Sequence, residues 1–407
     1  MEKKNSDPII VGFSNADFIC DGTDDDVQIQ AAVTLALSSG LNVEIRPGTY
    51  DISATITANV AGKTLKIVGS GMNSTLLVSS ITDGGHVVSI IGARDYGTEF
   101  FGISNLTITG SSTSGNGLYV ADTYQGEINN VRVTGCTNTS TSLGSGIHLY
   151  RSIDFIITNA IAIGCKYAGL LLDTSSNANT VIGGWLYGNT EAGLRLINGA
   201  NGNTFVGVIF ESNTVGDGVR VNGSTGSRYI SCWFENNQRG FYSGTSAGHQ
   251  VLRDCWFEKG SASKTHDVMF DNGTSYSFVV GCRVTNSTGN TGLVEIVAGA
   301  VDCSIIENHN IVTITNAGTN TKIRNNFGYI TENSGTAIVA NGQTSIVVTH
   351  GLSVTPTADD IMVTPTNSMG NAAKYYIGTF TSTEFTVTVD ADPGATTATF
   401  AWKGIVL

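Results

Sequence analysis

The chain has 407 residues, its formal net charge is −12 at neutral pH, and only 13% of its residues are charged. An acidic chain is repelled by phosphate backbones, so we expect no nucleic-acid partner. No apolar run approaches ~18 residues, which predicts that no segment spans a membrane. Glycine is abundant, at 50 residues, and proline is scarce, at 5, which favours many short strands joined by tight turns over a helical bundle.

The N-terminus carries charge, but no apolar core follows it. The sequence begins Met1-Glu-Lys-Lys-Asn-Ser-Asp-Pro8, so it predicts no signal peptide. If the protein acts outside a cell, we expect it to leave by lysis or as part of a particle. The seven cysteines show no C-x-x-C spacing. They are predicted to be buried free thiols, and we expect neither a metal site nor a cofactor.

Residues 1–50 are predicted to form an N-terminal cap. Asp24 or Asp25 can cap a helix whose apolar face would be Val27, Ala31 and Leu35. A strand is expected after the helix, followed by the turn Pro47-Gly-Thr-Tyr50. Such a cap is useful on a stacked β-structure because an open end exposes both core and unpaired strand edges.

A short phrase recurs in the middle of the chain. It reads Gly-Val-Ile-Phe-Glu-Ser-Asn at 207–213, Ser-Cys-Trp-Phe-Glu-Asn-Asn at 231–237 and Asp-Cys-Trp-Phe-Glu-Lys-Gly at 254–260. The glutamates are separated by 235 − 211 = 24 and 258 − 235 = 23 residues. A phrase that recurs at this spacing indicates a solenoid in which each repeat is one coil stacked on the last.

Each repeated phrase is predicted to be a strand whose side chains alternate between its two faces. If the phenylalanines point inward, the glutamates and the residues two positions before them point outward. Stacked strands lie about 4.7–4.9 Å apart. The sequence therefore predicts a ladder of three carboxylates on the outer wall, beside two stacked indoles.

Two further strand series accompany this one over residues 51–328. One begins after glycines, as in Gly193-Leu-Arg-Leu and Gly218-Val-Arg-Val, and the other is weaker, as in Asn203-Thr-Phe-Val-Gly. Three strands per coil of roughly 22–29 residues predict an all-β chain built on a three-sided parallel β-helix.

The N-terminal segment supports this architecture. Asp21-Gly-Thr-Asp-Asp, Gln28-Ile-Gln-Ala-Ala and Pro47-Gly-Thr-Tyr50 resemble the N-terminal cap of the pectate-lyase-like superfamily. That superfamily consists of right-handed parallel β-helices and includes phage tailspikes and many polysaccharide-degrading enzymes. The resemblance covers about 40 residues. It implies the right-handed fold and is silent on chemistry.

Residues 329–407 are predicted to form a separate small antiparallel β-sandwich, because alternating strands replace the coil period. Residues 336–350 are interpreted as a hairpin with a turn at Asn341-Gly342. The final Phe-Ala-Trp402-Lys strand resembles the H-type lectin-like trimerising domains of phage fibres, and this implies a trimerisation or lectin-like role.

The carboxylate ladder is the first candidate for chemistry. Glu235 and Glu258 are the preferred catalytic residues, and Glu211 is the third. Stacked carboxylates repel, so at least one pKa should rise, which supplies the acid and the base or nucleophile of glycoside hydrolysis. Both retaining and inverting separations are within reach. The residues predicted to bind sugar on the same wall are Trp185, Tyr187, Trp233, Trp256 and Arg283.

Two alternatives remain open at this stage. Arg195 and Arg220 could hold the carboxylate of an acidic sugar, with His148 and Tyr150 supporting β-elimination by a polysaccharide lyase. The apolar column could instead be the subunit interface of a non-catalytic trimeric fibre. The preferred hypothesis is a tailspike-like, extracellular or virion-associated homotrimer that binds and depolymerises polysaccharide.

Overall fold

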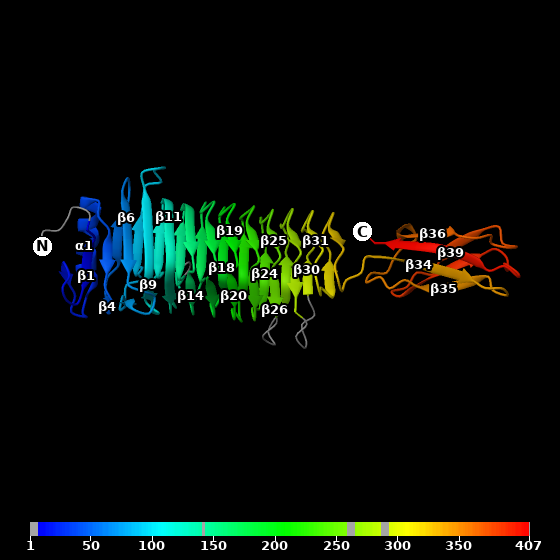
Figure 1. Cartoon of the computed structure of the whole chain (residues 1–407), viewed down its shortest axis with the longest axis horizontal. Helices are drawn as coiled ribbons and strands as arrows, with labels where there is room; N and C mark the ends of the chain where they lie inside the picture. The colour runs from blue at the N-terminus through cyan, green and yellow to red at the C-terminus, as the bar shows by residue number, and fades with distance from the viewer. Residues whose placement is uncertain (1–6, 141–142, 259–264, 286–292, 407) are drawn as a thin grey trace.

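The computed structural model describes residues 7–140, 143–258, 265–285 and 293–406. The molecule is elongated (Figure 1), with a helix at one end, a long stack of coils in the middle and a small sandwich at the other end. Two parallel sheets build the stack in the described residues, one of 22 strands and one of 11. The predicted all-β fold, a parallel β-helix followed by small antiparallel sheets, is confirmed.

Each coil contributes strands to three faces. Face 1 comprises β4 (Gly48–Ile52), β7 (Thr75–Ser79), β14 (Ile161–Ile163), β17 (Trp185–Tyr187), β20 (Ile209–Glu211), β23 (Trp233–Glu235), β26 (Trp256–Glu258) and β29 (Arg283–Val284). Face 2 comprises β5 (Ile56–Asn59), β8 (Val88–Ile91), β10 (Leu118–Ala121), β12 (Ile147–Tyr150), β15 (Leu170–Asp173), β18 (Ala192–Ile197), β21 (Asp217–Asn222), β24 (Arg239–Ser243), β27 (His266–Phe270), β30 (Leu293–Ile296) and β32 (Thr313–Asn316). Face 3 comprises β1 (Ile9–Gly12), β3 (Val43–Ile45), β6 (Thr64–Gly69), β13 (Ile153–Thr158), β16 (Thr180–Ile182), β19 (Thr204–Val206), β22 (Arg228–Ile230), β25 (Val251–Arg253), β28 (Phe278–Val280), β31 (Ser304–Ile306) and β33 (Lys322–Arg324).

A sharp corner joins face 3 to face 1. Two long strands, β9 (Phe100–Thr109) and β11 (Tyr124–Thr134), run through it, with Asn105 and Asn130 at positive φ at the bend. In later coils the strand breaks there, and Gly207, Ser231 and Asp254 take the left-handed conformation. Gly and Asn adopt this conformation at low cost, so the corner residues fix where each coil turns.

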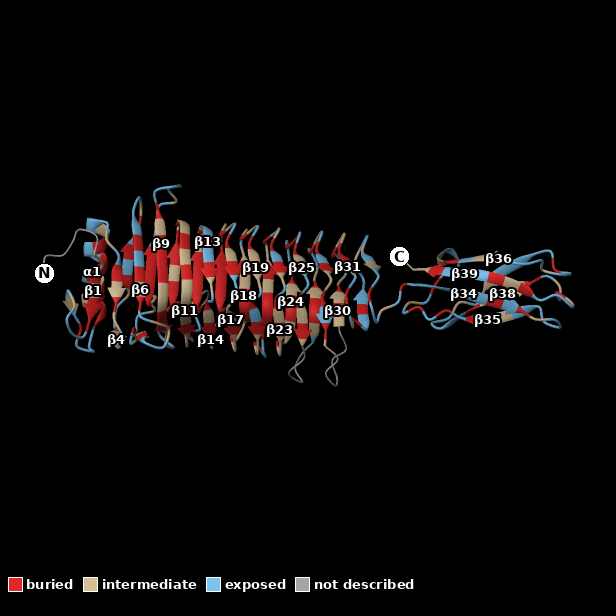
Figure 2. Cartoon of the chain, in the orientation of Figure 1, coloured by how far each residue is buried: buried red, intermediate tan, exposed pale blue. Residues whose placement is uncertain are grey.

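Buried residues run through the coils from end to end (Figure 2), and they form one continuous hydrophobic core. Phe210, Phe234 and Phe257 stack with ring centroids 5.0 and 4.6 Å apart. A buried asparagine ladder runs beside the loops that follow face 1. In it, Asn213 Nδ2 donates to Asn237 Oδ1 at 2.8 Å and to the Leu186 carbonyl oxygen at 3.2 Å. These amides pair backbone groups that the turns would otherwise leave unsatisfied in the interior.

The capping helix α1 (Asp26–Ser39) buries a different face from the one predicted. Val27, Ala31 and Leu35 point to solvent, and the buried residues are Ile29, Ala32, Val33 and Ala36. The helix has two apolar stripes. The one that faces the core has its members three and four residues apart, which follows the helical repeat closely. Asp25 sits at the N-cap position but makes no side-chain cap. Its carboxylate accepts the backbone N–H groups of Gly22 and Asp51 instead.

The C-terminal unit consists of two three-stranded antiparallel sheets in the described residues. Their strands are β34 (Glu332–Val339), β39 (Ala398–Ile405) and β36 (Ile361–Pro365), and β35 (Ser345–Thr349), β38 (Glu384–Val389) and β37 (Tyr375–Gly378). The predicted 336–350 hairpin is wrong, because β34 pairs with β39 and β35 pairs with β38. The Asn341-Gly342 turn carries the chain from one sheet of the sandwich to the other. The exact domain boundaries stay a prediction.

Two short elements and one contact of the C-terminus complete the structure. A short strand, β2 (Phe18–Ile19), adds to β1 at the N-terminal end, and a 3-10 turn, η1 (Ala358–Asp360), precedes β36. The C-terminus returns to the junction with the coils (Figure 1), where Val406 N donates to the Thr331 carbonyl oxygen at 2.9 Å. In the described part of the chain, no helix has the length and apolarity that a bilayer crossing requires.

Candidate functional site

The three glutamates of the repeated phrase lie in register on face 1. Strand β20 pairs with β23 and β23 with β26, so that Glu211 lies beside Glu235 and Glu235 beside Glu258. The phenylalanine before each glutamate is fully buried, and strand alternation therefore turns the glutamates outward. We call Glu211, Glu235 and Glu258 the carboxylate column. The sequence predicted this arrangement, and the pairing register agrees with it.

A second column runs beside the first on the same outer wall. In order along the stack it contains Trp185, Ile209, Trp233, Trp256 and Arg283, and we call it the aromatic column. Trp233 and Trp256 stack at 5.2 Å between ring centroids, with their planes 5° apart. The Arg283 guanidinium lies over the Trp256 ring at 5.1 Å, a distance at which a cation is attracted to the ring face.

The indole N–H groups hold two of the carboxylates. Trp185 Nε1 donates to Glu211 Oε2 at 2.9 Å across one coil. Trp233 Nε1 donates to Glu235 Oε2 at 3.1 Å within one strand. Trp256 Nε1 is buried and has no hydrogen-bond partner among the described residues. The aromatic column therefore fixes the orientation of Glu211 and Glu235, and this restriction is what a reacting carboxylate requires.

The environment shifts the pKa of Glu211 upward. Burial is the largest cause, and the negative charge of Glu235 adds to it. The hydrogen bond from Trp185 acts in the opposite direction but does not cancel the two. Glu211 was the third choice by sequence, and a raised pKa is what a general acid requires. Tyr187 precedes it in the column, and its ring lies 4.8 Å from that of Trp185.

The two arginines predicted to bind an acidic sugar lie on face 2, away from the carboxylate column, and both have partners. Arg195 Nη1 is 2.8 Å from Glu191 Oε2, and the guanidinium stacks on Tyr167 at 4.2 Å. Arg220 Nε is 2.5 Å from Asp217 Oδ2. Asp217 is fully buried and also binds Arg239. The internal ion pairs already use the charge that a uronate would need.

Face 2 also carries a cluster of ionisable rings near its N-terminal end. Tyr119 stacks on His86 at 4.4 Å and meets His148 edge-on at 5.1 Å. Burial lowers the pKa of His86 to about 4, and the neighbouring His148 contributes in the same direction. His86 Nδ1 accepts the backbone N–H of Asn116 at 3.0 Å. The sequence predicted a role for His148 and Tyr150 on this face, but it did not indicate that His86 and Asn116 would join them.

Hydrogen bonds fix the tautomer of His148. Asn116 Oδ1 accepts the backbone N–H of Ser145 at 2.9 Å, which turns Asn116 Nδ2 toward His148 Nδ1 at 3.1 Å. His148 Nδ1 is therefore an acceptor and the ring proton is on Nε2, 3.6 Å from Asp173 Oδ2. Burial alone would raise the pKa of Asp173, but its contact with His148 and hydrogen bonds from Asn198 and Thr174 bring it below its ordinary value. Neither nitrogen of His148 is placed to accept a proton from a substrate.

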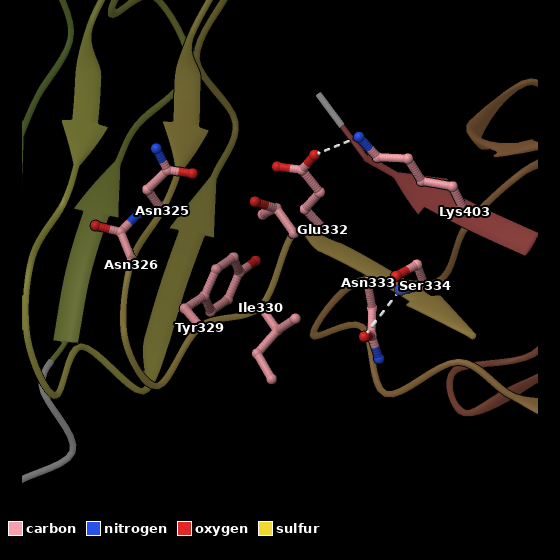
Figure 3. Close-up of a pocket in the computed structure, with 9 residues that line it drawn as sticks. Asn325, Asn326, Tyr329, Ile330, Glu332, Asn333, Ser334 and Lys403 are labelled. Atoms are coloured by element: carbon pink, nitrogen blue, oxygen red, sulfur yellow. Dashed lines mark hydrogen bonds and ion pairs between the residues drawn. The ribbon is translucent and has the colours of Figure 1, made fainter.

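An open pocket of about 580 Å³ lies where the coils meet the sandwich (Figure 3). It is lined mostly by polar residues that follow β33 or begin β34, including Asn325, Tyr329 and Asn333. The two charged residues of its lining, Glu332 and Lys403, pair with each other at 2.9 Å. With its charges neutralised in this way, the pocket offers no acid, base or nucleophile, so we do not place the reaction there.

Comparisons with known proteins support the fold. The model of the family described as "Periplasmic copper-binding protein (NosD)" matches residues 52–216, less than half of the chain. No curated protein matches it. Among solved structures, tailspike gp49 from Pseudomonas phage LKA1 is 14% identical with a TM-score of 0.56, over 93% of this chain and 92% of that one. Tailspike gp61 of Pseudomonas phage phi297 is 10% identical with a TM-score of 0.55, over 94% and 92%.

A third solved structure is the A-module of the mannuronan C-5 epimerase AlgE6 from Azotobacter vinelandii. It is 17% identical with a TM-score of 0.56, over 78% of this chain and 98% of that one. This chain has the parallel β-helix fold of phage tailspikes. At these identities the likeness concerns the fold, and the chemistry must be argued from the side chains.

Copper binding is said of the matching family model, and the residues present here do not fit it. No group of three or more His, Cys, Asp or Glu side chains is placed to hold a metal ion in the described part of the chain. The seven cysteines are free and buried. Their positions suit small apolar residues of the core, and no metal enters the reaction below.

Proposed function

We propose that this protein is a tailspike-like glycan depolymerase that hydrolyses glycosidic bonds at the carboxylate column. The single observation that carries the proposal is the in-register stack of Glu211, Glu235 and Glu258 beside half-exposed indoles. Glycoside hydrolysis needs two carboxyl groups of unequal pKa on one wall, together with an apolar surface against which a sugar ring can rest.

In the proposed reaction Glu211 is the general acid. Its raised pKa favours the protonated form, and the hydrogen bond from Trp185 orients the carboxyl group. The protonated carboxyl gives its proton to the glycosidic oxygen as the bond from that oxygen to the anomeric carbon breaks. The leaving sugar departs as an alcohol, and Glu211 is left as a carboxylate that accepts a proton from the incoming water.

Glu235 is the proposed nucleophile. It lies one coil from Glu211, where stacked backbones are about 4.7–4.9 Å apart, close to the ~5–5.5 Å between the carboxyl groups of retaining enzymes. Its carboxylate attacks the anomeric carbon to form a glycosyl ester, and water activated by Glu211 then cleaves that ester. Glu258, two coils from Glu211, is proposed to orient the substrate.

The geometry gives less support to β-elimination. That reaction needs a base aimed at a proton next to a carboxylate and a cation that holds the carboxylate. Arg195 and Arg220 are paired internally, and His148 uses Nδ1 as an acceptor for Asn116. We therefore favour hydrolysis over elimination.

We further propose that the protein is a homotrimer, extracellular or carried on a virion, and that face 3 forms its interface. Ile182, Val206 and Ile230 follow one another in register on the outside of face 3. Ile156, Ile182 and Phe278 on this face are 52%, 45% and 40% exposed. An apolar strip of this kind on a charged, acidic protein is typical of a buried contact. This assignment leaves the carboxylate column on face 1 open to glycan.

The proposed reaction is tested by digesting a panel of bacterial surface polysaccharides and measuring the molecular masses of the products. Hydrolysis adds one water per bond cleaved, elimination adds none and leaves an unsaturated sugar, and binding alone leaves the polymer intact. Products heavier by water support the proposal, whereas unsaturated products that absorb in the ultraviolet, or an intact panel, contradict it.

The assembly is tested separately. Light scattering on the purified chain should give three times the monomer mass, and Ile182→Glu together with Ile230→Glu should reduce this to the monomer. Ile209→Glu, on face 1, is the matched control and should leave the trimer intact. If Ile209→Glu dissociates the trimer and the face 3 variant does not, the interface lies on face 1.

A further inference from the structure

We propose that the glycan accepted at the carboxylate column is uncharged, with no carboxylate, phosphate or sulfate groups along the bound segment. The inference rests on the proposed hydrolytic function and names its substrate class. It follows from the distribution of charge around the column and from the hydrogen-bonding character of the groups that line it.

Negative charge accumulates along this part of face 1. Glu211, Glu235 and Glu258 occupy consecutive coils. The neighbouring positions of the aromatic column are the uncharged Ile209, Trp233 and Trp256. A polyanion lying on this wall would meet the carboxylates of Glu235 and Glu258 at the spacing of the strands, and that of Glu211 whenever it is ionised, on a chain whose net charge is already −12.

Among the described residues, the arginines of face 2 are held in ion pairs, and Arg132 of face 1 donates from Nη1 to Asn73 Oδ1. Arg195 is paired with Glu191, and the fully buried Asp217 binds both Arg220 and Arg239. Releasing any of these arginines to a ligand would leave a carboxylate unpaired, and for Asp217 that carboxylate is buried. Arg283, which stacks on Trp256 at one end of the column, is the one cation among the members of the aromatic column, against the negative charges of Glu235 and Glu258.

The same groups suit an uncharged sugar. Ionised carboxylates only accept hydrogen bonds, and the hydroxyl groups of a neutral pyranose donate them. The half-buried rings of Trp233 and Trp256 offer apolar contact to the C–H groups of a sugar ring. An uncharged glycan therefore finds complementary partners along the column, while an acidic glycan brings further acceptors to the acceptors of Glu235 and Glu258.

Fluorescence quenching tests the charge at the column directly. The chain has four tryptophans. Trp185, Trp233 and Trp256 lie in the aromatic column, and Trp402 is buried in the sandwich at 6% exposure. Iodide and caesium probe the same surface with opposite charge, and acrylamide controls for exposure. At low salt we expect iodide to quench about threefold less than caesium relative to acrylamide, and this difference should shrink as salt screens it.

Two triple variants, each with three glutamates replaced by glutamine, show whether the charge of the column causes this difference. E211Q/E235Q/E258Q should bring iodide quenching close to that of caesium. E44Q/E127Q/E307Q removes the same charge away from the column and should keep the difference. If iodide quenches the wild-type protein as well as caesium does, or if both triple variants behave alike, the inference is overturned.

A second experiment, with polysaccharides, distinguishes failure of this inference from failure of the proposed function on which it rests. Polygalacturonate and its carboxyl-reduced form share a backbone and differ in charge, and they are added to the panel of neutral and acidic surface polysaccharides. Cleavage or binding confined to uncharged members supports the inference. Preferential cleavage of an acidic member overturns it while hydrolysis stands, whereas an entirely uncut panel removes the proposed function.

Discussion

Trp185 donates its indole N–H to Glu211 across one coil, with 2.9 Å between Nε1 and Oε2. This bond links the two outer columns of face 1 and stabilises the ionised form of the carboxyl group that we assign as the acid. Burial and the charge of Glu235 oppose it and keep the pKa of Glu211 above its ordinary value. The pH dependence of the reaction should therefore respond to this one indole.

Replacing Trp185 with Phe removes the donor and keeps an aromatic ring. Activity requires protonated Glu211 and is lost as pH rises through its pKa. Without the hydrogen bond that pKa rises further, so the alkaline limb of the pH–rate profile should move to higher pH. Trp233→Phe, which removes the bond to Glu235 instead, is the control. A limb that stays in place in Trp185→Phe would remove Glu211 from the role of acid.

The spacing of neighbouring coils predicts retention of configuration. Fresh product examined by NMR before mutarotation should carry the same anomeric configuration as the substrate, because Glu235 attacks the carbon and water then displaces it. Inverted product would mean that a carboxylate two coils from Glu211 activates water. In that case Glu258, and not Glu235, would be the second catalytic residue.

The buried asparagine ladder should contribute strongly to stability. Asn213→Ala leaves the Asn189 N–H and the Leu186 carbonyl oxygen without their partner in a dry interior. We expect a loss of roughly 2–4 kcal/mol in the free energy of unfolding, from two unsatisfied buried groups. Asn272→Ala, at an exposed position, should change stability by less than about 0.5 kcal/mol. Thermal or denaturant unfolding of both variants measures the difference.

His86 should make the protein less stable in mild acid. Its pKa is lowered from 6.5 to about 4 in the folded state, so the unfolded chain binds the proton more readily. This contribution is fully present above pH ~6.5 and is lost as pH falls toward 4, by roughly 3 kcal/mol at most. His86→Gln should flatten the fall in stability between these pH values, whereas the exposed His309→Gln should not. Equal slopes in the wild-type protein and His86→Gln would contradict the assignment.

The repeated phrase explains why the fold and the carboxylate column could be predicted. Glu211, Glu235 and Glu258 recur at nearly constant spacing, and a constant coil length forces identical positions into register. Alternation along each strand then decides which side chains point outward. Both steps use local pattern alone, and neither requires knowledge of distant contacts.

Other features depend on contacts that the pattern does not encode. Arg195 and Arg220 occur in similar Gly-Leu-Arg and Gly-Val-Arg phrases, and their partners Glu191 and Asp217 lie just before those phrases, where nothing marks them as ion-pair acceptors. His86 and His148 both contact the Tyr119 ring only because face 2 stacks the coils that carry them. The predicted buried face of α1 was wrong because the helix has two apolar stripes, and its packing against the first coil decides which of them is buried.

The central claim is that the carboxylate column cleaves glycan, and the release of reducing ends by Glu211→Gln and Glu235→Gln tests it most directly. The substrate is a polysaccharide that the wild-type protein degrades. We predict that each substitution lowers turnover by at least about a hundredfold while glycan binding persists, and that Glu127→Gln, on face 3, leaves turnover unchanged. Undiminished release of reducing ends by both column variants would contradict the account.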